Sequence, residues 1–191
     1  QEKLGTKALK VIGKSPTQCP NISIKLKTKM ETRINFFEKG QGAMKALYNV
    51  GLYANKSPLG AELLHLIYYR VSQVNGCAYC LDMHSKDALA LGESVQRLLV
   101  MDAWRETSLF TDRERAAFAW AEEVTLLNGP VTDATYNEAL KHFSETDLID
   151  LTMAVIAINS YNRLNLAFPN PAIVGTYFPG AHKPVDKTAE V

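Results

Sequence analysis

Apolar residues recur along the chain, from about Met30 onward, at the three- and four-residue spacing that is typical of amphipathic helices. Ala43, Leu47 and Val50 belong to one such stripe, and Pro58 follows as a stop signal. The repeated pattern predicts helices over residues 41–55, 59–75, 77–91, 94–101, 111–128, 132–143 and 144–163.

Residues with capping chemistry mark several of the predicted helix ends. Thr111 and Glu114 have the spacing of a capping box, in which each side chain accepts a hydrogen bond from the other residue's backbone N–H. Ser144 is placed to cap the last long helix, and Asn75 is available to cap the helix predicted to start at Cys77. Local and periodic signals therefore agree on most helix boundaries.

The segment 144–163 is apolar on nearly every side, whereas an ordinary surface helix has a single apolar stripe. We therefore expect it at the centre of the fold or in an interface, and its apolar surface predicts a homo-oligomer. The strand-like alternation in the sequence is limited to Ile22, Ile24 and Leu26. The predicted fold class is all-α, a compact bundle of several helices.

Length and composition favour one domain. The chain has 191 residues, of which 47% are hydrophobic and 21% charged, and its three cysteines cannot form a disulfide framework. Residues 1–30 contain seven lysines against one acidic residue. We therefore expect a basic, solvated extension over residues 1–29, a helical domain over 30–172 and a surface tail over 173–191.

The charge and hydropathy patterns bear on partners and location. A net charge of +1 argues against a nucleic-acid-binding module, and no run approaches the ~18 apolar residues that span a bilayer. The sequence also lacks the apolar core of a secretory signal. We expect a cytoplasmic protein, whose thiols stay reduced, with no nucleic-acid or membrane partner.

Cys77, Cys80 and His84 are the residues with recognisable chemistry. Their i, i+3 and i, i+4 spacings put the three side chains on one face of a helix. The helix start stabilises a thiolate, two thiols one turn apart can form a disulfide, and the histidine can accept or relay a proton. The alternative is plain packing, because cysteine is among the most buried residue types.

A metal site built on these cysteines is a third possibility. Structural zinc sites usually have four ligands in two spaced pairs. Cys19 lies in the basic extension, while His142 and His182 have no partner at ligand spacing. We therefore assign no metal and no other cofactor to the predicted site.

The sequence around this motif carries a longer pattern. Its segments are Arg70-Val71-Ser72-Gln73, Asn75-Gly76-Cys77-Ala78-Tyr79-Cys80, Asp82-Met83-His84, Trp104-Arg105-Glu106, Phe110-Thr111, Glu114-Arg115, Trp120-Ala121-Glu122, Val124-Thr125, Asn159 and Asn162-Arg163. The pattern resembles the alkylhydroperoxidase AhpD-like proteins of the carboxymuconolactone decarboxylase superfamily, over roughly residues 30–172. The cysteine pair points to the peroxidase-like branch, because the decarboxylases lack it.

The resemblance implies a compact helical subunit that forms homo-oligomers and reduces a small hydroperoxide with its cysteine pair. A thiol or a lipoylated protein would then reduce the disulfide. In the family the second cysteine attacks the peroxide, which implies that role for Cys80, with Cys77 resolving and His84 in a proton relay. The helix dipole instead favours the thiolate at Cys77, nearer the helix start.

His65 departs from the family pattern. The family's peroxidases have a glutamate twelve residues before the first cysteine, where it acts as the base of the relay. A histidine with a pKa of about 6.5 can also act as a base. Glu62 could orient His65 and raise its pKa. Alternatively His65 only packs, and the protein is a thiol–disulfide exchange protein, a redox sensor, or a structural oligomer with a passive cysteine pair.

Two further residues are assigned to structure. Tyr79 is expected to be an aromatic packing or interface residue, because it points away from the face shared by the cysteines. Arg163 is expected to pair with a carboxylate such as Glu122 or Asp147.

Overall fold

A computed structural model describes residues 31–180, and every regular element in that range is a helix. The all-α prediction is confirmed, while the basic extension 1–29 and the strand-like stretch 22–26 lie outside the described residues. The helices are α1 (Phe36–Lys39), α2 (Gln41–Asn55), α3 (Ala61–Asn75), α4 (Ala78–Ala90), α5 (Val95–Val100), α6 (Asp112–Leu126), α7 (Asp133–Ala139) and α8 (Glu145–Ala167), with the short 3₁₀ helices η1 (Met101–Glu106) and η2 (Pro171–Ile173).

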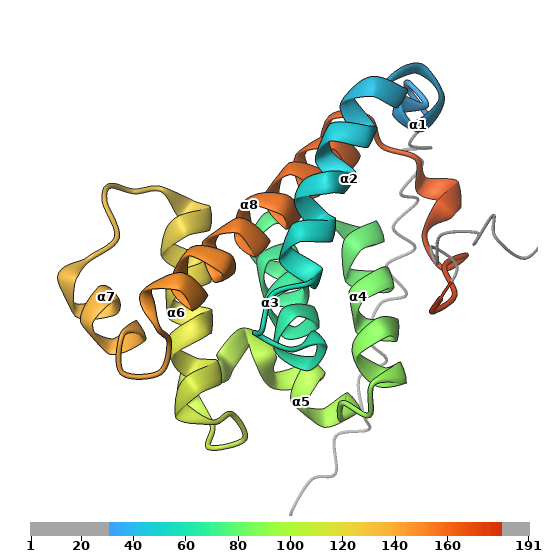
Figure 1. The fold of residues 1–191 in the computed structure, drawn as a ribbon. Coiled ribbons are helices and arrows are strands. Elements are labelled where there is room, and N and C mark those ends of the chain that lie inside the picture. Colours follow the sequence, from blue (N-terminus) through green and yellow to red (C-terminus); the bar gives the residue numbers. More distant parts are fainter. Residues whose placement is uncertain (1–30, 181–191) are drawn as a thin grey trace, which may run out of the picture.

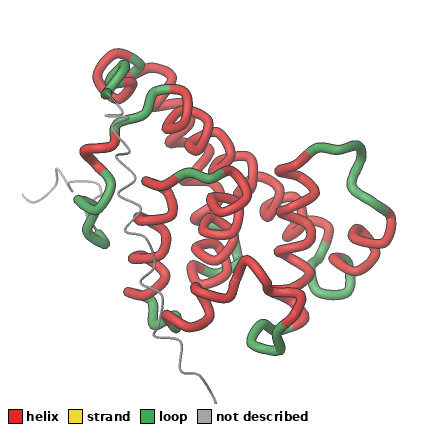
Figure 2. Tube along the Cα trace, turned by 180° about the vertical axis from the view of Figure 1, so that it is seen from behind, coloured by secondary structure: helices red, strands yellow, loops and turns green. Residues whose placement is uncertain are grey.

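Helix α3 lies at the centre of the arrangement and contacts α4, α6 and α8 (Figure 1). The long helix α8 crosses the molecule, with α2 packed along one part of it and α6 along another. Seen from behind, the same helices form one continuous bundle, and α7 lies at the end away from α4 (Figure 2). The turn between α3 and α4, which holds the cysteine motif, therefore starts from the central helix.

The core is formed by apolar side chains from α3, α6 and α8. Ile67 and Val71 of α3, Phe118 of α6, and Leu151 and Val155 of α8 are all fully buried. Each such side chain contributes roughly 1.5–3 kcal/mol relative to an exposed one. Helix α8 therefore buries one apolar face in the core, in agreement with the expectation that it lies at the centre of the fold. It also has apolar residues on its outer side.

The helix caps agree with the sequence at three ends and differ at one. Thr111 with Glu114, and Ser144 with Asp147, form complete capping boxes, and Thr132 caps α7. Asn75 does not cap α4, which corrects our expectation: it is the last residue of α3. Gly76 follows in the left-handed conformation, with φ 67°, and Cys77 itself is the N-cap residue. The turn needs a positive φ, so the glycine rather than the asparagine sets its geometry.

Helix lengths differ slightly from those predicted. Helix α7 ends at Ala139 rather than 143, and α8 continues to Ala167 rather than 163. Although α8 is long and largely apolar, no helix in residues 31–180 is both long and apolar enough to cross a membrane.

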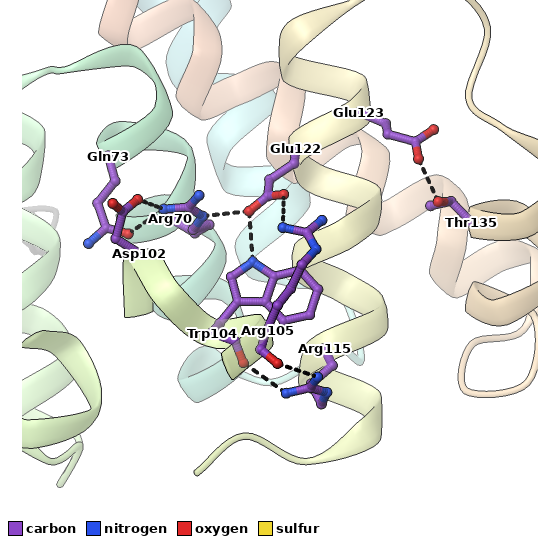
Figure 3. A network of polar contacts seen from close by, with 9 residues as sticks. All are labelled: Arg70, Gln73, Asp102, Trp104, Arg105, Arg115, Glu122, Glu123 and Thr135. Carbon is purple, nitrogen blue, oxygen red and sulfur yellow. Dashed lines mark hydrogen bonds and ion pairs between the residues drawn. The ribbon is translucent and has the colours of Figure 1, made fainter. Parts of the chain in front are cut away.

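A buried polar network joins α3, η1 and α6 (Figure 3). Glu122 accepts hydrogen bonds from Arg70 Nε and Trp104 Nε1, both at 2.7 Å, and pairs with Arg105 at 2.8 Å. Arg163 was expected to pair with this carboxylate or with Asp147, and that expectation is wrong: its guanidinium donates to the backbone and side-chain oxygens of Asn159. Glu122 is already paired with Arg70 and Arg105.

Candidate functional site

The two cysteines of the motif lie side by side at the start of α4. Cys77 is extended, with φ −87° and ψ 96°, and Cys80 is on the first turn of the helix. Their Sγ atoms are 2.7 Å apart, both are free thiols, and each residue is 1% exposed. The N-cap position of Cys77 turns its side chain back over the first turn, which is what brings the two sulfurs together.

The local environment shifts the pKa values of the two thiols in opposite directions. The hydrogen bond shared with Cys80 lowers the pKa of Cys77, and the amides of Tyr79, Cys80 and Asn162 act in the same direction against burial. The same sulfur–sulfur contact, together with burial, raises the pKa of Cys80. Cys77 therefore loses its proton before Cys80, and a second negative charge on the pair is disfavoured.

Amide side chains from α8 surround the pair. Asn165 Nδ2 lies 3.5 Å from Cys80 Sγ. Asn162 is fully buried and accepts a hydrogen bond from Asn75 at 2.9 Å. The sequence marked Asn162 only as part of a family pattern, and the structure gives it a position beside the thiols.

His84 lies one turn further along α4 and is buried. It is 6% exposed, and burial, together with the nearby His65, lowers its pKa to about 3. Its ring is 5.0 Å from the ring of Tyr68 and 5.7 Å from that of His65, measured between centroids. Neither ring nitrogen has a hydrogen-bond partner among residues 31–180. His84 is thus a neutral imidazole near neutral pH, and its lowered pKa makes it a weak base.

His65 comes from α3 and faces the same carboxylate as His84. The Nδ1 atoms of His65 and His84 lie 3.9 Å and 4.0 Å from Asp87 Oδ2. Burial lowers the pKa of His65, and the carboxylates of Asp87 and Glu62 oppose this with smaller effects. We expected Glu62 to raise this pKa. Burial outweighs it, and Asp87 is the carboxylate that the ring faces.

The residues after α8 complete this part of the site. Tyr177 is buried and donates a hydrogen bond of 2.6 Å to Asp87 Oδ1. Lys86 Nζ donates to the carbonyl oxygens of Gly175 and Tyr177, at 3.4 Å and 3.0 Å, and the Gly175 N–H donates to Asp82. These contacts fix the segment along α4.

A cavity of about 790 Å³ opens beside these groups. Its walls come from α1, α2, α3, α4, α8 and the segment around Tyr177, and they are mostly apolar. Cys80, His84, His65 and Asp87 line it, whereas Cys77 does not. The tyrosines on its walls are Tyr48, Tyr68, Tyr79, Tyr161 and Tyr177. Tyr79 is half-buried against the core, as expected for packing, and also faces the cavity.

The structure brings the four sequence-predicted residues, Cys77, Cys80, His84 and His65, into one region where α3 meets α4. Sequence reasoning missed several neighbours. Asp87 stands three residues after His84, a helical spacing that was available as a signal. Tyr177 and Asn165 reach the site through tertiary packing, for which the sequence contained no local sign.

Comparison with known proteins gives one family and several relatives. Residues 41–123 match the carboxymuconolactone decarboxylase family. The uncharacterised protein YdfG of Bacillus subtilis (strain 168) is 35% identical over 144 residues, which span 75% of this chain and 98% of that protein.

Two solved structures have the same fold. The first is a protein of unknown function from Agrobacterium tumefaciens, described as a candidate antioxidant defence protein AhpD. It has 36% identity and a TM-score of 0.70, over 72% of this chain and 95% of that one. The second is an uncharacterised peroxidase-related protein from Silicibacter sp. TM1040. It has 25% identity and a TM-score of 0.60, over 72% and 74% of the two chains.

Proposed function

Because the chain belongs to the carboxymuconolactone decarboxylase family and carries a thiol pair beside an apolar cavity, we propose that it is a thiol-dependent hydroperoxide reductase. One observation carries the proposal: Cys80 belongs both to the 2.7 Å sulfur pair and to the cavity wall. A hydroperoxide in the cavity can therefore meet a sulfur whose resolving partner is already in place.

In the first step the Cys80 thiolate attacks one oxygen of the hydroperoxide, and the O–O bond breaks. The sulfur becomes a sulfenic acid, and the other oxygen leaves as an alcohol after taking a proton. Cys77, by then a thiolate, attacks the sulfenic sulfur, so that a disulfide forms and hydroxide leaves, which takes a proton from solvent to become water. Two thiols of the reductant restore the pair, which balances one hydroperoxide against one dithiol.

The lower pKa of Cys77 and the position of Cys80 in the cavity wall are compatible with one mechanism. Across 2.7 Å the two sulfurs share one proton, so the charge can pass to the sulfur that faces the substrate. His84, a neutral imidazole one turn away, relays the remaining proton to the leaving alkoxide: one ring nitrogen donates to the alkoxide as the other accepts from the sulfurs. His65 supports His84 as the next group in the relay.

The apolar, tyrosine-lined cavity supports an organic hydroperoxide as the substrate class. We further propose a small thiol or a lipoylated protein as reductant, a homo-oligomeric assembly, and a cytoplasmic location, with no nucleic-acid or membrane partner. The apolar residues on the outside of α8 support the homo-oligomeric assembly.

The test uses the full chain with Cys19→Ser as background and a chelator present to keep trace metal ions from the thiols. Cumene hydroperoxide at one equivalent should remove two thiols per chain, and a dithiol should restore them. Cys77→Ser should accumulate a sulfenic acid on Cys80, which a dimedone adduct reveals by mass. His84→Gln should slow thiol oxidation by about 100-fold, the lower range for general acid–base assistance.

Cys80→Ser is the matched control, since it keeps Cys77 but should form no dimedone adduct. Thiols that survive several equivalents of hydroperoxide would contradict the proposal. If such a chain, once oxidised by a disulfide reagent, still exchanges with dihydrolipoamide, the alternative of a thiol–disulfide exchanger is supported instead. The observation that favours this alternative is the replacement of the family's glutamate by His65.

A further inference from the structure

We propose that His65, His84 and Asp87 bind a divalent first-row transition-metal ion, such as Zn²⁺ or Fe²⁺, separately from the thiol pair. One ligand atom from each residue lies within 4.8 Å of the other two. The three residues come from α3 and α4, so the site exists only when these two helices are packed.

The histidine nitrogens are the first reason. His65 Nδ1 and both ring nitrogens of His84 are buried and have no hydrogen-bond partner within the described part of the chain. Buried polar atoms in folded proteins nearly always have one, so these three atoms need an explanation. Both Nδ1 atoms face Asp87 Oδ2, at distances too long for a hydrogen bond.

The spacing is the second reason. Two atoms that each lie about 2.0–2.2 Å from one metal ion are about 3–3.5 Å from each other. The observed 3.9 Å and 4.0 Å are longer by about 0.5–1 Å, and no two of the three ligand atoms are more than 4.8 Å apart. Small side-chain rotations would bring the three atoms onto one ion, without a change in either helix.

The orientation of Asp87 is the third reason. The hydroxyl of Tyr177 donates to Oδ1 at 2.6 Å, and this leaves Oδ2 directed at the two histidines. Such a hydrogen bond on the far oxygen is what orients carboxylate ligands in metal sites. Tyr177 thus acts as a positioning residue for the proposed ligand.

The donor set indicates the kind of ion. Two imidazoles and one carboxylate suit zinc and ferrous iron, and leave further coordination positions open. All three residues also line the cavity, so water or a substrate oxygen can reach those positions. A calcium or magnesium ion is disfavoured, since both prefer oxygen ligands.

Metal binding at this site would also affect the thiol chemistry. A bound ion would occupy the nitrogen lone pairs that accept protons in the proposed relay, so the metal-loaded protein should react with hydroperoxide more slowly. This consequence rests on the proposed function, whereas metal binding itself does not.

The experiment titrates Co²⁺ into a full-length chain in which Cys19, Cys77 and Cys80 are all replaced by serine. We expect one ion per chain, with d–d bands in the visible range and no thiolate charge-transfer band. In the same background Asp87→Asn, which keeps the shape of the side chain, should weaken binding by more than about 100-fold. Tyr177→Phe should weaken it by about 10–100-fold, as for other outer-sphere partners of metal ligands.

His142→Ala is the matched control, because it removes an imidazole that lies 3.5 Å from a carboxylate oxygen of Glu138 on α7. Its Co²⁺ affinity should equal that of the parent. Circular dichroism of each variant shows whether the helices are intact, and Tyr177→Phe tests the site without removing a ligand. A cysteine-free chain that binds no Co²⁺, or an Asp87→Asn variant that binds as tightly as its parent, overturns the proposal. Both readouts are independent of peroxide reduction.

Discussion

Asn162 connects the cysteine turn to α8 at the scale of single residues. Its Nδ2 donates to Ser72 Oγ at 3.2 Å, and its Oδ1 accepts from Asn75 Nδ2 at 2.9 Å. Asn75 Nδ2 also donates to Asn159 at 2.9 Å. This network holds the end of α3, and with it the start of the turn to Cys77, against the long helix.

Asn162→Ala should therefore destabilise the fold. The substitution removes a donor and an acceptor from a fully buried site, and the partners left behind cost about 1–3 kcal/mol. Urea unfolding followed by circular dichroism measures the change. Asn137→Ala, at an exposed position of α7, should stay within about 0.5 kcal/mol of the parent. Equal effects of the two substitutions would show that the network does not stabilise the turn.

The candidate site could be predicted from the sequence only where its residues are close along the chain. Cys77, Cys80 and His84 share one helix start, so their spacing alone indicated a common face. His65 was recognisable through its distance from the first cysteine, but its partner Asp87 follows from the packing of α3 on α4. Tyr177 is 90 residues from Asp87, and no periodicity or cap relates two such positions.

Glu122 joins three elements, α3, η1 and α6, through Arg70, Trp104 and Arg105. Burial would raise the pKa of this carboxyl, but the hydrogen bonds from Trp104, Arg105 and Arg70 outweigh it and lower the pKa below its ordinary value. A carboxyl whose folded-state pKa is depressed stabilises the fold above its unfolded-state pKa. That contribution is lost as the pH falls through the folded-state pKa.

We predict that the free energy of unfolding falls as the pH drops below about 4.3, the unfolded-state pKa of glutamate. Glu122→Gln should destabilise the protein by about 1–3 kcal/mol near neutral pH, because it removes the carboxylate that Arg70, Trp104 and Arg105 share. Arg70 keeps its ion pair with Asp102, which limits the loss. The variant should also lose part of the acid dependence. Urea midpoints from pH 3 to 7 measure both effects.

Glu138→Gln is the control for Glu122, since Glu138 is an exposed carboxylate of α7 that pairs at 2.6 Å with Lys141, which follows the end of that helix. Exposed pairs contribute little, so its urea midpoint near neutral pH should match the parent. A Glu122→Gln variant with parental stability and an unchanged acid slope would show that the network is not what links α3 to α6.

At the scale of elements, local chemistry decided which boundaries could be predicted. The caps at Thr111 and Ser144 are present as expected, and each depends on a residue three positions further along. The capping box at Thr111 was predicted as such, whereas the partner of Ser144, Asp147, was not. Asn75 had the right residue type for a cap, but the left-handed Gly76 ends α3 after it and its amide binds α8 instead. The partner of Arg163 depends on tertiary packing, which local sequence chemistry does not indicate. Two other arginines pair with Glu122 instead.

At the scale of the whole molecule, α8 has an inner and an outer apolar face. Its inner face is in the core, whereas Ile149 and Ile156, seven residues apart, are 61% and 44% exposed. Met153 lies between them on the same side and is partly exposed. Tyr53 of α2, also exposed, is held beside this face by a 2.7 Å hydrogen bond to Asp150. Contiguous exposed apolar surface of this kind is typical of subunit interfaces.

We therefore predict that the protein is a homo-oligomer through this face of α8. Light scattering at micromolar concentration should give a multiple of the 21.2 kDa chain mass. Ile156→Asp should reduce the mass toward that of one chain, because the interface would have to bury an unpaired carboxylate. Leu99→Asp, at an even more exposed apolar residue on α5, should leave the assembly unchanged, since α5 is not part of this face. A parent protein that scatters as a single chain, or an Ile156→Asp variant that keeps the parental mass, would place any interface elsewhere or exclude it.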